Sequence, residues 1–352
     1  MATYAIWNNK GGVGKSYLTF QIACEYARTH QGKKVLVIDL CPQANASSML
    51  LGGIDKGEKQ LANFAVANPR RTIAGYVEER IVSPYLSPRT GSKYISQLNP
   101  LNSHVPDNLF LVVGDEALEI QASRIARAAI PGPPEAWRLV HSWISDLIQD
   151  VKQAWNVSDL TTFIDCNPSF TVYTELAMSA SDNLLIPFSA DGSSKRAVRA
   201  VLALLYGNSR VQGSQQSEFY LNSNQFRMSV PKIYAYAGNR LTQGNMAAAN
   251  AYRTVVNEIG REIFDAWRSA PNNFAVHPQG SQVPRTAAEF KRMFQFEIND
   301  ANTASVVSGG LGIPMSSLVA GSKRLAGKNI QVNQTQLDKQ QPNIRKFVAN
   351  ID

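Results

Sequence analysis

The chain has 352 residues, of which 44% are hydrophobic, and a net charge of +8, so it can bury a substantial core in one large or two modest domains. No run of about 18 apolar residues is present and a predicted strand starts almost at once, so we expect neither a transmembrane helix nor a secretory signal. The three cysteines show no CxxC spacing, which disfavours structural zinc and favours a reduced, cytoplasmic protein.

The net positive charge comes from the second half of the chain. Residues 1–190 hold 16 Lys/Arg and 17 Asp/Glu, whereas residues 191–352 hold 19 Lys/Arg and 10 Asp/Glu. A near-neutral first half and a basic second half favour a polyanionic partner. A surface that is basic only for solubility is the alternative interpretation.

A glycine-rich segment lies between a predicted strand and a predicted helix. A β-rich run at residues 3–7 precedes it, and apolar residues at helical spacing follow it from residue 17 to residue 29. The segment contains K-G-G-V-G-K-S, a shifted form of the phosphate-loop pattern G-x-x-x-x-G-K-[ST], because Lys10 stands where the first glycine would be. This context favours phosphate binding over a glycine-rich turn without a nucleotide.

The residue types of this segment suit a nucleotide triphosphate. Glycines let successive backbone N–H groups converge on an anion, at a helix N-terminus that adds partial positive charge. Lys15 would reach the β- and γ-phosphates, and the Ser16 hydroxyl would bind Mg²⁺. The predicted ATP contacts in this segment are Lys10, Gly11, Gly12, Val13, Gly14, Lys15, Ser16 and Tyr17.

The sequence K-G-G-V-G-K-S resembles the deviant Walker A motif of the ParA/MinD family of ATPases. In that family the first lysine reaches across a dimer interface to the partner's nucleotide, so the resemblance implies a catalytic role for Lys10 as well as Lys15. Tyr17 departs from the family, which usually has Thr or Ser there, so a side-chain hydroxyl for the α-phosphate is lost.

Two predicted buried strands, at residues 35–39 and 160–165, each end in an aspartate. Carboxylates at the C-terminal ends of parallel strands lie where α/β sheets bind ligands. The sequences D-L-C-P-Q from Asp39 and D-C-N-P-S from Asp165 are similar to the family's D-x-D-P-Q and D-x-P-P-S segments. The resemblance implies that Asp39 positions the attacking water and that Ser16, Asp39 and Asp165 hold Mg²⁺. Cys41 replaces the family's second acid.

Later strand ends extend the resemblance. Predicted strands at residues 182–187 and 232–237 end in segments that resemble the family's I-P and N-R, which implies that Pro187 and Asn239 contact the adenine. Strand–helix alternation over residues 2–260 predicts an α/β fold with a mostly parallel twisted sheet and helices on both faces. We therefore expect a single P-loop ATPase domain over residues 1–352.

The middle of the chain follows the alternation less clearly. We predict an insertion at residues 51–108, in which a short helix starts near residue 71 and a Ser-, Pro-, Asn- and Gly-rich loop covers residues 83–106. A strand is expected at residues 108–114. A pair of prolines then opens one long amphipathic helix over residues 133–155.

Residues 320–352 are a predicted C-terminal extension that diverges from the family. Ile344, Phe347, Val348 and Ile351 share one face of a predicted helix there. This face suits packing onto the core or onto a dimer partner. The alternative is a membrane-surface helix as in the MinD branch, although the helix is short and has only two basic residues.

The resemblance implies a ParA-type ATPase that binds ATP and Mg²⁺, forms a nucleotide-sandwich homodimer and binds DNA non-specifically. It would partition or position a plasmid, a chromosome or another cargo, and a ParB-like or adaptor protein would stimulate its slow hydrolysis. Such a protein is cytoplasmic and nucleoid-associated, with no stable membrane insertion. The candidate DNA contacts are basic residues that cluster in the second half of the chain: Arg285, Lys291, Arg292, Lys323, Arg324 and Lys328.

Three other classes remain as alternatives. A MinD-like positioning ATPase at the membrane would need a more basic C-terminal amphipathic helix. A scaffold that binds nucleotide with little turnover has the same loop and is separated only by a hydrolysis assay. A reductase iron protein also shares the loop, but it needs paired cluster-ligating cysteines, which this sequence lacks.

Overall fold

The computed structural model describes residues 2–130, 132–208, 215–241 and 246–352. Its strands are β1 (Thr3–Ile6), β2 (Lys34–Asp39), β3 (Ile95–Gln97), β4 (Leu109–Val112), β5 (Leu160–Asp165), β6 (Asn183–Phe188), β7 (Lys232–Leu241), β8 (Gln295–Asn299), β9 (Gly321–Leu325) and β10 (Lys328–Val332). Its α-helices are α1 (Lys15–Thr29), α2 (Asn45–Leu50), α3 (Gly53–Val66), α4 (Ile73–Val82), α5 (Leu118–Ala129), α6 (Ala136–His141), α7 (Trp143–Trp155), α8 (Val172–Ala180), α9 (Gly192–Tyr206), α10 (Glu218–Gln225), α11 (Met246–Ser269), α12 (Ala287–Phe294), α13 (Thr303–Leu311) and α14 (Gln334–Val348). Short 3₁₀ helices η1, η2 and η3 lie at Gly91–Tyr94, Pro271–Asn273 and Met315–Ser317.

Within the described residues, one large sheet has eight strands in the order β3-β4-β2-β5-β1-β6-β7-β8. All neighbours in it are parallel except the edge strand β3, which runs antiparallel to β4. Parallel neighbours bring the C-terminal ends of β1, β2 and β5 to the same edge of the sheet. The predicted α/β fold with a mostly parallel sheet is confirmed.

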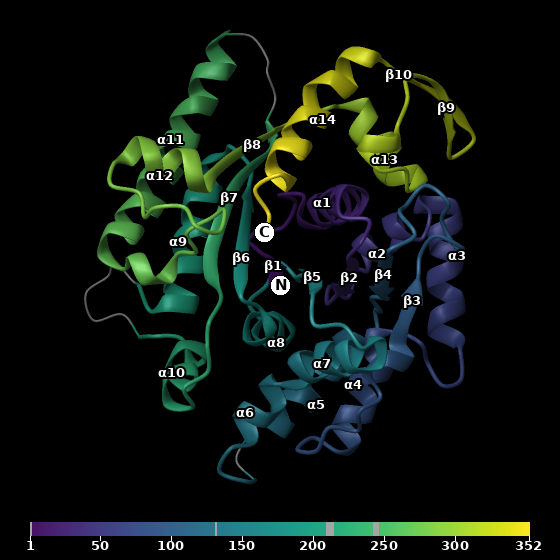
Figure 1. The fold of residues 1–352 in the computed structure, drawn as a ribbon, viewed down its shortest axis with the longest axis vertical. Coiled ribbons are helices and arrows are strands. Elements are labelled where there is room, and N and C mark those ends of the chain that lie inside the picture. The colour runs from purple at the N-terminus through teal and green to yellow at the C-terminus, as the bar shows by residue number, and fades with distance from the viewer. Residues whose placement is uncertain (1, 131, 209–214, 242–245) are drawn as a thin grey trace.

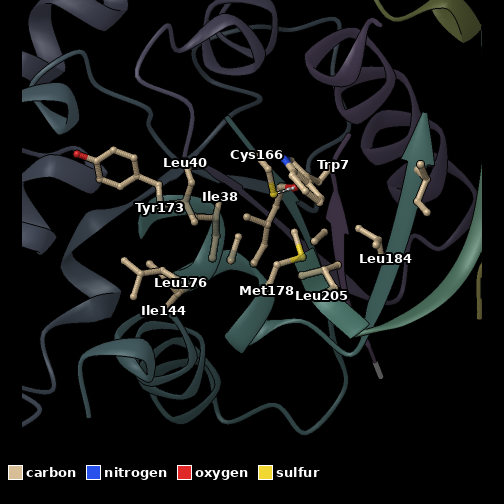
Figure 2. Close-up of a cluster of buried hydrophobic side chains, with 14 of the residues drawn as sticks. Trp7, Ile38, Leu40, Ile144, Cys166, Tyr173, Leu176, Met178, Leu184 and Leu205 are labelled. Carbon is tan, nitrogen blue, oxygen red and sulfur yellow. Dashed lines mark hydrogen bonds between the residues drawn. The ribbon is translucent and has the colours of Figure 1, made fainter. Parts of the chain in front are cut away.

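Helices cover both faces of this sheet (Figure 1), with α1, α13 and α14 on one side and α7 and α8 on the other. The side-chain alternation of β1 explains the two layers, because Tyr4 and Ile6 join one buried cluster while Ala5 and Trp7 join the other. Figure 2 shows part of the second cluster, in which Trp7 packs beside Cys166 near the residues that follow the strand ends. Each fully buried large apolar side chain contributes about 1.5–3 kcal/mol.

The strands that the sequence predicts in the first two thirds of the chain are confirmed as β1, β2, β4, β5, β6 and β7. The short helix expected near residue 71 is confirmed as α4. Two other expectations are wrong in detail. The loop expected at residues 83–106 contains η1 and the edge strand β3. The single helix expected at residues 133–155 is two helices, α6 and α7.

A local side-chain contact accounts for the break between α6 and α7. The Ser142 hydroxyl donates to the Arg138 carbonyl at 2.8 Å, as the Ser142 backbone N–H also does at 3.0 Å. A serine that bonds back to the preceding turn competes with the helical ladder at that point. The break lets the Trp143 indole N–H donate to the Pro84 carbonyl at 2.9 Å from within the core.

The C-terminal helix α14 packs against α1 and β8. Its predicted apolar face is buried, with Ile344, Phe347 and Val348 each at most 3% exposed. Packing onto the core is therefore confirmed, and this face is not presented to a membrane surface. In the part of the chain that the structure describes, no helix combines the length and apolar character needed to cross a bilayer.

Replacing Phe347 by alanine tests this packing. The ring lies 4.7 Å from the Phe296 ring and is 1% exposed, so Phe347→Ala should lower the free energy of unfolding by about 3–5 kcal/mol. Urea denaturation measures the change. The exposed neighbour substitution Lys346→Ala should change it by less than about 0.5 kcal/mol. Equal effects of the two variants would mean that α14 is not docked.

Candidate nucleotide-binding site

A cavity of about 470 Å³ opens where the loop between β1 and α1 meets the ends of β2 and β5. Its floor is formed by the glycine-rich loop, and α2, α3 and α13 supply the remaining walls. The residues that line it include Gly12, Gly14, Lys15, Ser16, Tyr17, Cys41 and Cys166. A concave site at the carboxyl ends of parallel strands is the expected ligand position of such a sheet.

The backbone of the loop depends on glycine at two positions. Gly12 and Gly14 have φ of 74° and 79°, in the left-handed region that favours glycine. Gly14 is the N-cap of α1, and the first residues of the helix, Lys15, Ser16 and Tyr17, line the cavity. Val13 is 1% exposed and anchors the loop between the two glycines. This geometry suits an anion at the helix N-terminus.

Lys15 lies buried beneath this loop at 6% exposure. Its ammonium donates to the Lys10 carbonyl at 2.7 Å and to the Asn8 carbonyl at 3.3 Å. Burial lowers the pKa of Lys15, and the nearby Asp165 carboxylate acts in the opposite direction. In the structure, two loop carbonyls therefore accept from the Lys15 ammonium, the group that is predicted to bind phosphates.

Lys10, the lysine expected to cross a dimer interface, contacts its own subunit here. Its ammonium forms an ion pair with Asp191 and donates to the Ser189 hydroxyl at 3.0 Å and the Ser194 hydroxyl at 3.3 Å. These partners lie at the start of α9. The reach of Lys10 to a partner's nucleotide stays a prediction.

Ser16 and Asp165, two of the predicted Mg²⁺ ligands, lie together. The Ser16 hydroxyl donates to Asp165 Oδ2 at 2.7 Å, and Thr19 donates to Asp165 Oδ1 at 3.0 Å. A hydroxyl beside a carboxylate is an all-oxygen donor set of the kind that Mg²⁺ prefers, together with water and phosphate. The two residues fit the ion, with Ser16 on the cavity wall and Asp165 directly behind it.

Asp39 is placed differently from its predicted role. It pairs in register with Asp165 on the neighbouring strand, is 0% exposed and lies behind the cavity wall. Its Oδ2 accepts from the Ser47 backbone at 2.9 Å and the Ser47 hydroxyl at 2.7 Å, and its Oδ1 accepts from the Cys41 N–H at 3.1 Å. Contact with a metal or an attacking water thus needs a rearrangement of the segment that follows β2.

Burial governs the protonation of both aspartates. It raises the pKa of Asp39 to about 6, against hydrogen bonds from Ser47. It also raises the pKa of Asp165 to about 7, with the adjacent charge of Asp39 as a second cause. Two like charges on adjacent strand ends disfavour double ionisation in the absence of a cation.

The predicted adenine contacts and Tyr17 have partners within the protein. The Asn239 amide donates to the Val13 carbonyl at 3.0 Å and the Gly14 carbonyl at 3.3 Å, so it holds the loop. The Pro187 carbonyl accepts from the Asn8 amide at 2.7 Å. The Tyr17 hydroxyl donates to Gln340 of α14 at 2.6 Å. Adenine contact by Pro187 and Asn239 stays a prediction.

Sequence reasoning missed Asn8, Thr19 and Asp191 at this site. Thr19 lies one helical turn after Ser16, a spacing that places both hydroxyls on one face of α1. Asp191 precedes a helix in the sequence S-A-D-G-S-S, which is typical of an N-cap. Asn8 carried no comparable signal, because its role depends on β6 lying beside β1.

The candidate DNA contacts lie in two separate places. Arg285 and Arg292 line a second cavity of about 420 Å³ beside α12, where Lys291 is also exposed. Arg324 and Lys328 are exposed on the β9–β10 hairpin, and Lys323 is half-buried there. Figure 1 places α12 and this hairpin at opposite sides of the molecule.

The basic residues of α9 are partly neutralised. Lys195 bonds Glu258 at 3.0 Å and Arg199 bonds Glu262 at 2.7 Å, both across to α11. Charges that already have carboxylate partners are less available to phosphates, so this cluster is a weaker candidate for a DNA surface than the exposed ones.

Replacing Asp165 by asparagine tests the burial of its charge. The folded chain binds the Asp39 and Asp165 protons more tightly than the unfolded chain, whose carboxyls titrate near 3.8. The free energy of unfolding should therefore fall as pH rises from about 4 to about 7. Without nucleotide or Mg²⁺, Asp165→Asn should be more stable than the wild type by about 1–3 kcal/mol at pH 8, and the difference should shrink at pH 5.

Urea denaturation at the two pH values measures this difference. Gln153→Ala, at an exposed residue of α7 that does not titrate, serves as control and should leave the pH dependence of the wild type unchanged. A difference that is the same at pH 5 and pH 8 would contradict the burial of an ionisable Asp165.

Comparison with known proteins identifies the family. A family model described as an AAA domain matches residues 1–218. The sporulation initiation inhibitor protein Soj of Bacillus subtilis is 26% identical over 187 residues, which cover 53% of this chain and 58% of Soj. The virulence plasmid ParA family protein pGP5-D of Chlamydia muridarum is 38% identical over 68 residues, which cover 19% of this chain and 25% of that protein. The match thus spans 58% of the length of Soj and 25% of the length of pGP5-D.

Solved structures share the fold over more of the chain. Apo McdA of Cyanothece aligns with a TM-score of 0.60 at 15% identity, covering 98% of both chains. The pNOB8 ParA structure aligns with a TM-score of 0.52 at 15% identity, covering 84% of this chain and 80% of that one. The family match shows that the chain belongs to the AAA domain family, and its similarity to Soj and to a ParA family protein, together with the shared fold, supports a P-loop protein of the ParA/MinD type.

Proposed function

We propose that the protein is an ATP- and Mg²⁺-dependent, dimerising ATPase of ParA type, with residues 1–352 acting as one ATPase domain. The observation that carries the proposal is the cavity itself, in which Gly12, Gly14, Lys15 and Ser16 lie at the N-terminus of α1 in front of Asp165. Backbone N–H groups, one buried lysine and one hydroxyl–carboxylate pair are the groups that a triphosphate with its cation requires.

Separate residues would bind the phosphates and the cation. Incoming phosphates would compete with the Lys10 and Asn8 carbonyls for the Lys15 ammonium, and charge-assisted bonds to phosphate are the stronger class. Ser16 and Asp165 would hold Mg²⁺, which supplies charge stabilisation at the β- and γ-phosphates. Asp165 would be ionised when it holds the cation, so nucleotide binding and deprotonation of this residue would support each other.

Asp39 would orient the attacking water after the segment 41–47 moves. In the structure Ser47 and Cys41 hold this carboxylate, which is consistent with slow intrinsic hydrolysis that a partner accelerates. We propose that a ParB-like or adaptor protein favours the rearranged segment. The alternative of a nucleotide-binding scaffold predicts no release of phosphate from ATP.

Relatives support ATP binding and a partition role. A McdA variant has been solved as an ATP complex and aligns with a TM-score of 0.60 at 14% identity. The names of the relatives include a plasmid ParA family protein and a ParA. We propose that this protein likewise moves a plasmid, a chromosome or another cargo, as a cytoplasmic, nucleoid-associated homodimer.

We further propose that the dimer binds DNA without sequence preference. The second half of the chain carries the whole positive excess, and Arg285, Lys291 and Arg292 are exposed together at α12. Two subunits would combine their α12 surfaces, so ATP-dependent dimerisation would raise DNA affinity without any contact between DNA and nucleotide. Arg324 and Lys328 on the hairpin are the second candidate surface.

Lys15→Ala tests nucleotide binding. Loss of the one buried ammonium under the loop should weaken ATP binding by tenfold or more, which corresponds to about 1.4 kcal/mol or more. Isothermal titration calorimetry measures the affinity, and the exposed substitution Lys59→Ala should leave it unchanged. ATP affinity equal to the wild type in Lys15→Ala would contradict the assignment of the site.

Charge reversal at α12 tests the DNA surface. If a dimer neutralises about six phosphates, the log–log slope of DNA affinity against salt should be near −5. The triple substitution Arg285→Glu, Lys291→Glu and Arg292→Glu should abolish binding of random duplex DNA in a filter assay, while ATP-dependent dimerisation survives. Lys195→Gln, which removes a cation already paired with Glu258, is the matched control and should bind normally. DNA affinity that does not depend on ATP would reject the idea.

A further inference from the structure

Lys10 pairs with a carboxylate at the start of α9, a helix that is not among the elements lining the nucleotide cavity. Its ammonium pairs with Asp191 and also donates to Ser189 and Ser194. The side chain is 23% exposed and that of Asp191 is 46% exposed, so the pair lies at the surface, where a second subunit could reach it. This contact has no part in cradling phosphates.

The two oxygens of Asp191 have separate partners. Oδ1 caps α9, accepting from the Ser193 N–H at 3.0 Å and the Ser194 N–H at 3.2 Å. Oδ2 receives the Lys10 ammonium and the Ser189 hydroxyl. Partial burial raises the pKa of Asp191, but the hydrogen bonds from Lys10, Ser189 and Ser193 outweigh it and hold the pKa below its ordinary value. Helix capping therefore needs only one oxygen, and the other is committed to Lys10.

A direct bond connects this pair to the phosphate site. The Lys15 ammonium donates to the backbone carbonyl of Lys10 at 2.7 Å. A phosphate that draws Lys15 away removes one of the bonds that fix the backbone of residue 10. The side chain of Lys10 then remains held chiefly by Asp191 and the two serines. Residue 10 thus contacts the phosphate-site lysine through its backbone and Asp191 through its side chain.

We propose that Asp191 is a positioning residue that holds Lys10 on its own subunit in the nucleotide-free monomer, and that nucleotide binding weakens this contact so that Lys10 can extend to a partner subunit. The inference rests on the proposed dimerising function and adds its control: the Lys10–Asp191 contact opposes dimerisation until the cavity is filled. An exposed ion pair suits this role, because it is weak enough to be broken by the phosphates of one nucleotide.

The substitution Asp191→Asn separates the two oxygens. Asparagine caps helices as well as aspartate does, so Oδ1 still accepts from Ser193 and Ser194, whereas the amide group in place of Oδ2 cannot accept from Lys10. The ATP concentration for half-maximal dimerisation, measured by analytical ultracentrifugation, should fall about three- to tenfold, because a part-exposed charged hydrogen bond no longer opposes release. The control is Glu258→Gln in α11, which removes a carboxylate partner of Lys195 in α9. It should leave that concentration unchanged.

A second readout does not depend on dimerisation. In the nucleotide-free monomer, acylation of Lys10 by an N-hydroxysuccinimide ester, followed by mass spectrometry, should be several-fold faster in Asp191→Asn than in the wild type, and unchanged in Glu258→Gln. Equal Lys10 labelling in the wild type and Asp191→Asn would overturn the inference. A wild type that never dimerises with ATP would instead contradict the proposed function, while faster labelling in Asp191→Asn would still support the Lys10–Asp191 contact.

Discussion

Two carboxylates that share one buried edge of the sheet dominate the site. Asp39 and Asp165 end adjacent parallel strands in register, and both are 0% exposed. Burying two like charges side by side is unfavourable. Within the described residues, neither carboxylate is hydrogen-bonded to an arginine or lysine, and donors from Ser16, Thr19 and Ser47 hold them instead. A divalent cation with its phosphates would relieve this repulsion, which is the physical reason for proposing that ligand at this site.

The two loop lysines, both among the described residues, do not hydrogen-bond to these carboxylates and have other partners in the subunit. Lys15 is close enough to Asp165 for their charges to interact, yet its ammonium bonds carbonyls of its own loop. Lys10 pairs with Asp191 at the start of α9. Both cations thus have partners within one subunit before any phosphate arrives. Under the proposed function, a nucleotide would change the partner of Lys15, and the carbonyl of Lys10 links that change to the second lysine.

Much of this site could be predicted from the sequence because its signals are local. A strand, a glycine-rich turn and a helix follow one another at residues 3–29, and each buried strand that ends in aspartate is visible in a few residues. The partners of Lys10 and Tyr17 could not be predicted, since Asp191 and Gln340 lie 181 and 323 residues away in the chain. Only the tertiary arrangement of α9 and α14 brings them to the loop.

The helix α3 shows a different limit. Gly53 and Gly57 lower its helical propensity, so the pattern of residues 53–66 does not predict a helix. In the fold, a Cβ at Gly53 would lie 2.1 Å from the Gly310 carbonyl oxygen, and one at Gly57 would lie 2.2 Å from the Ser48 carbonyl oxygen. These glycines are therefore required by close contact with α13 and α2, and a scale of intrinsic propensity misreads them.

Nucleotide-dependent self-association tests the central claim most directly. Sedimentation of the wild-type protein should give the mass of one chain without nucleotide or with ADP, and twice that mass with ATP and Mg²⁺. A mass that is the same in all three conditions, with ATP shown to be bound, would contradict a dimerising ATPase of ParA type.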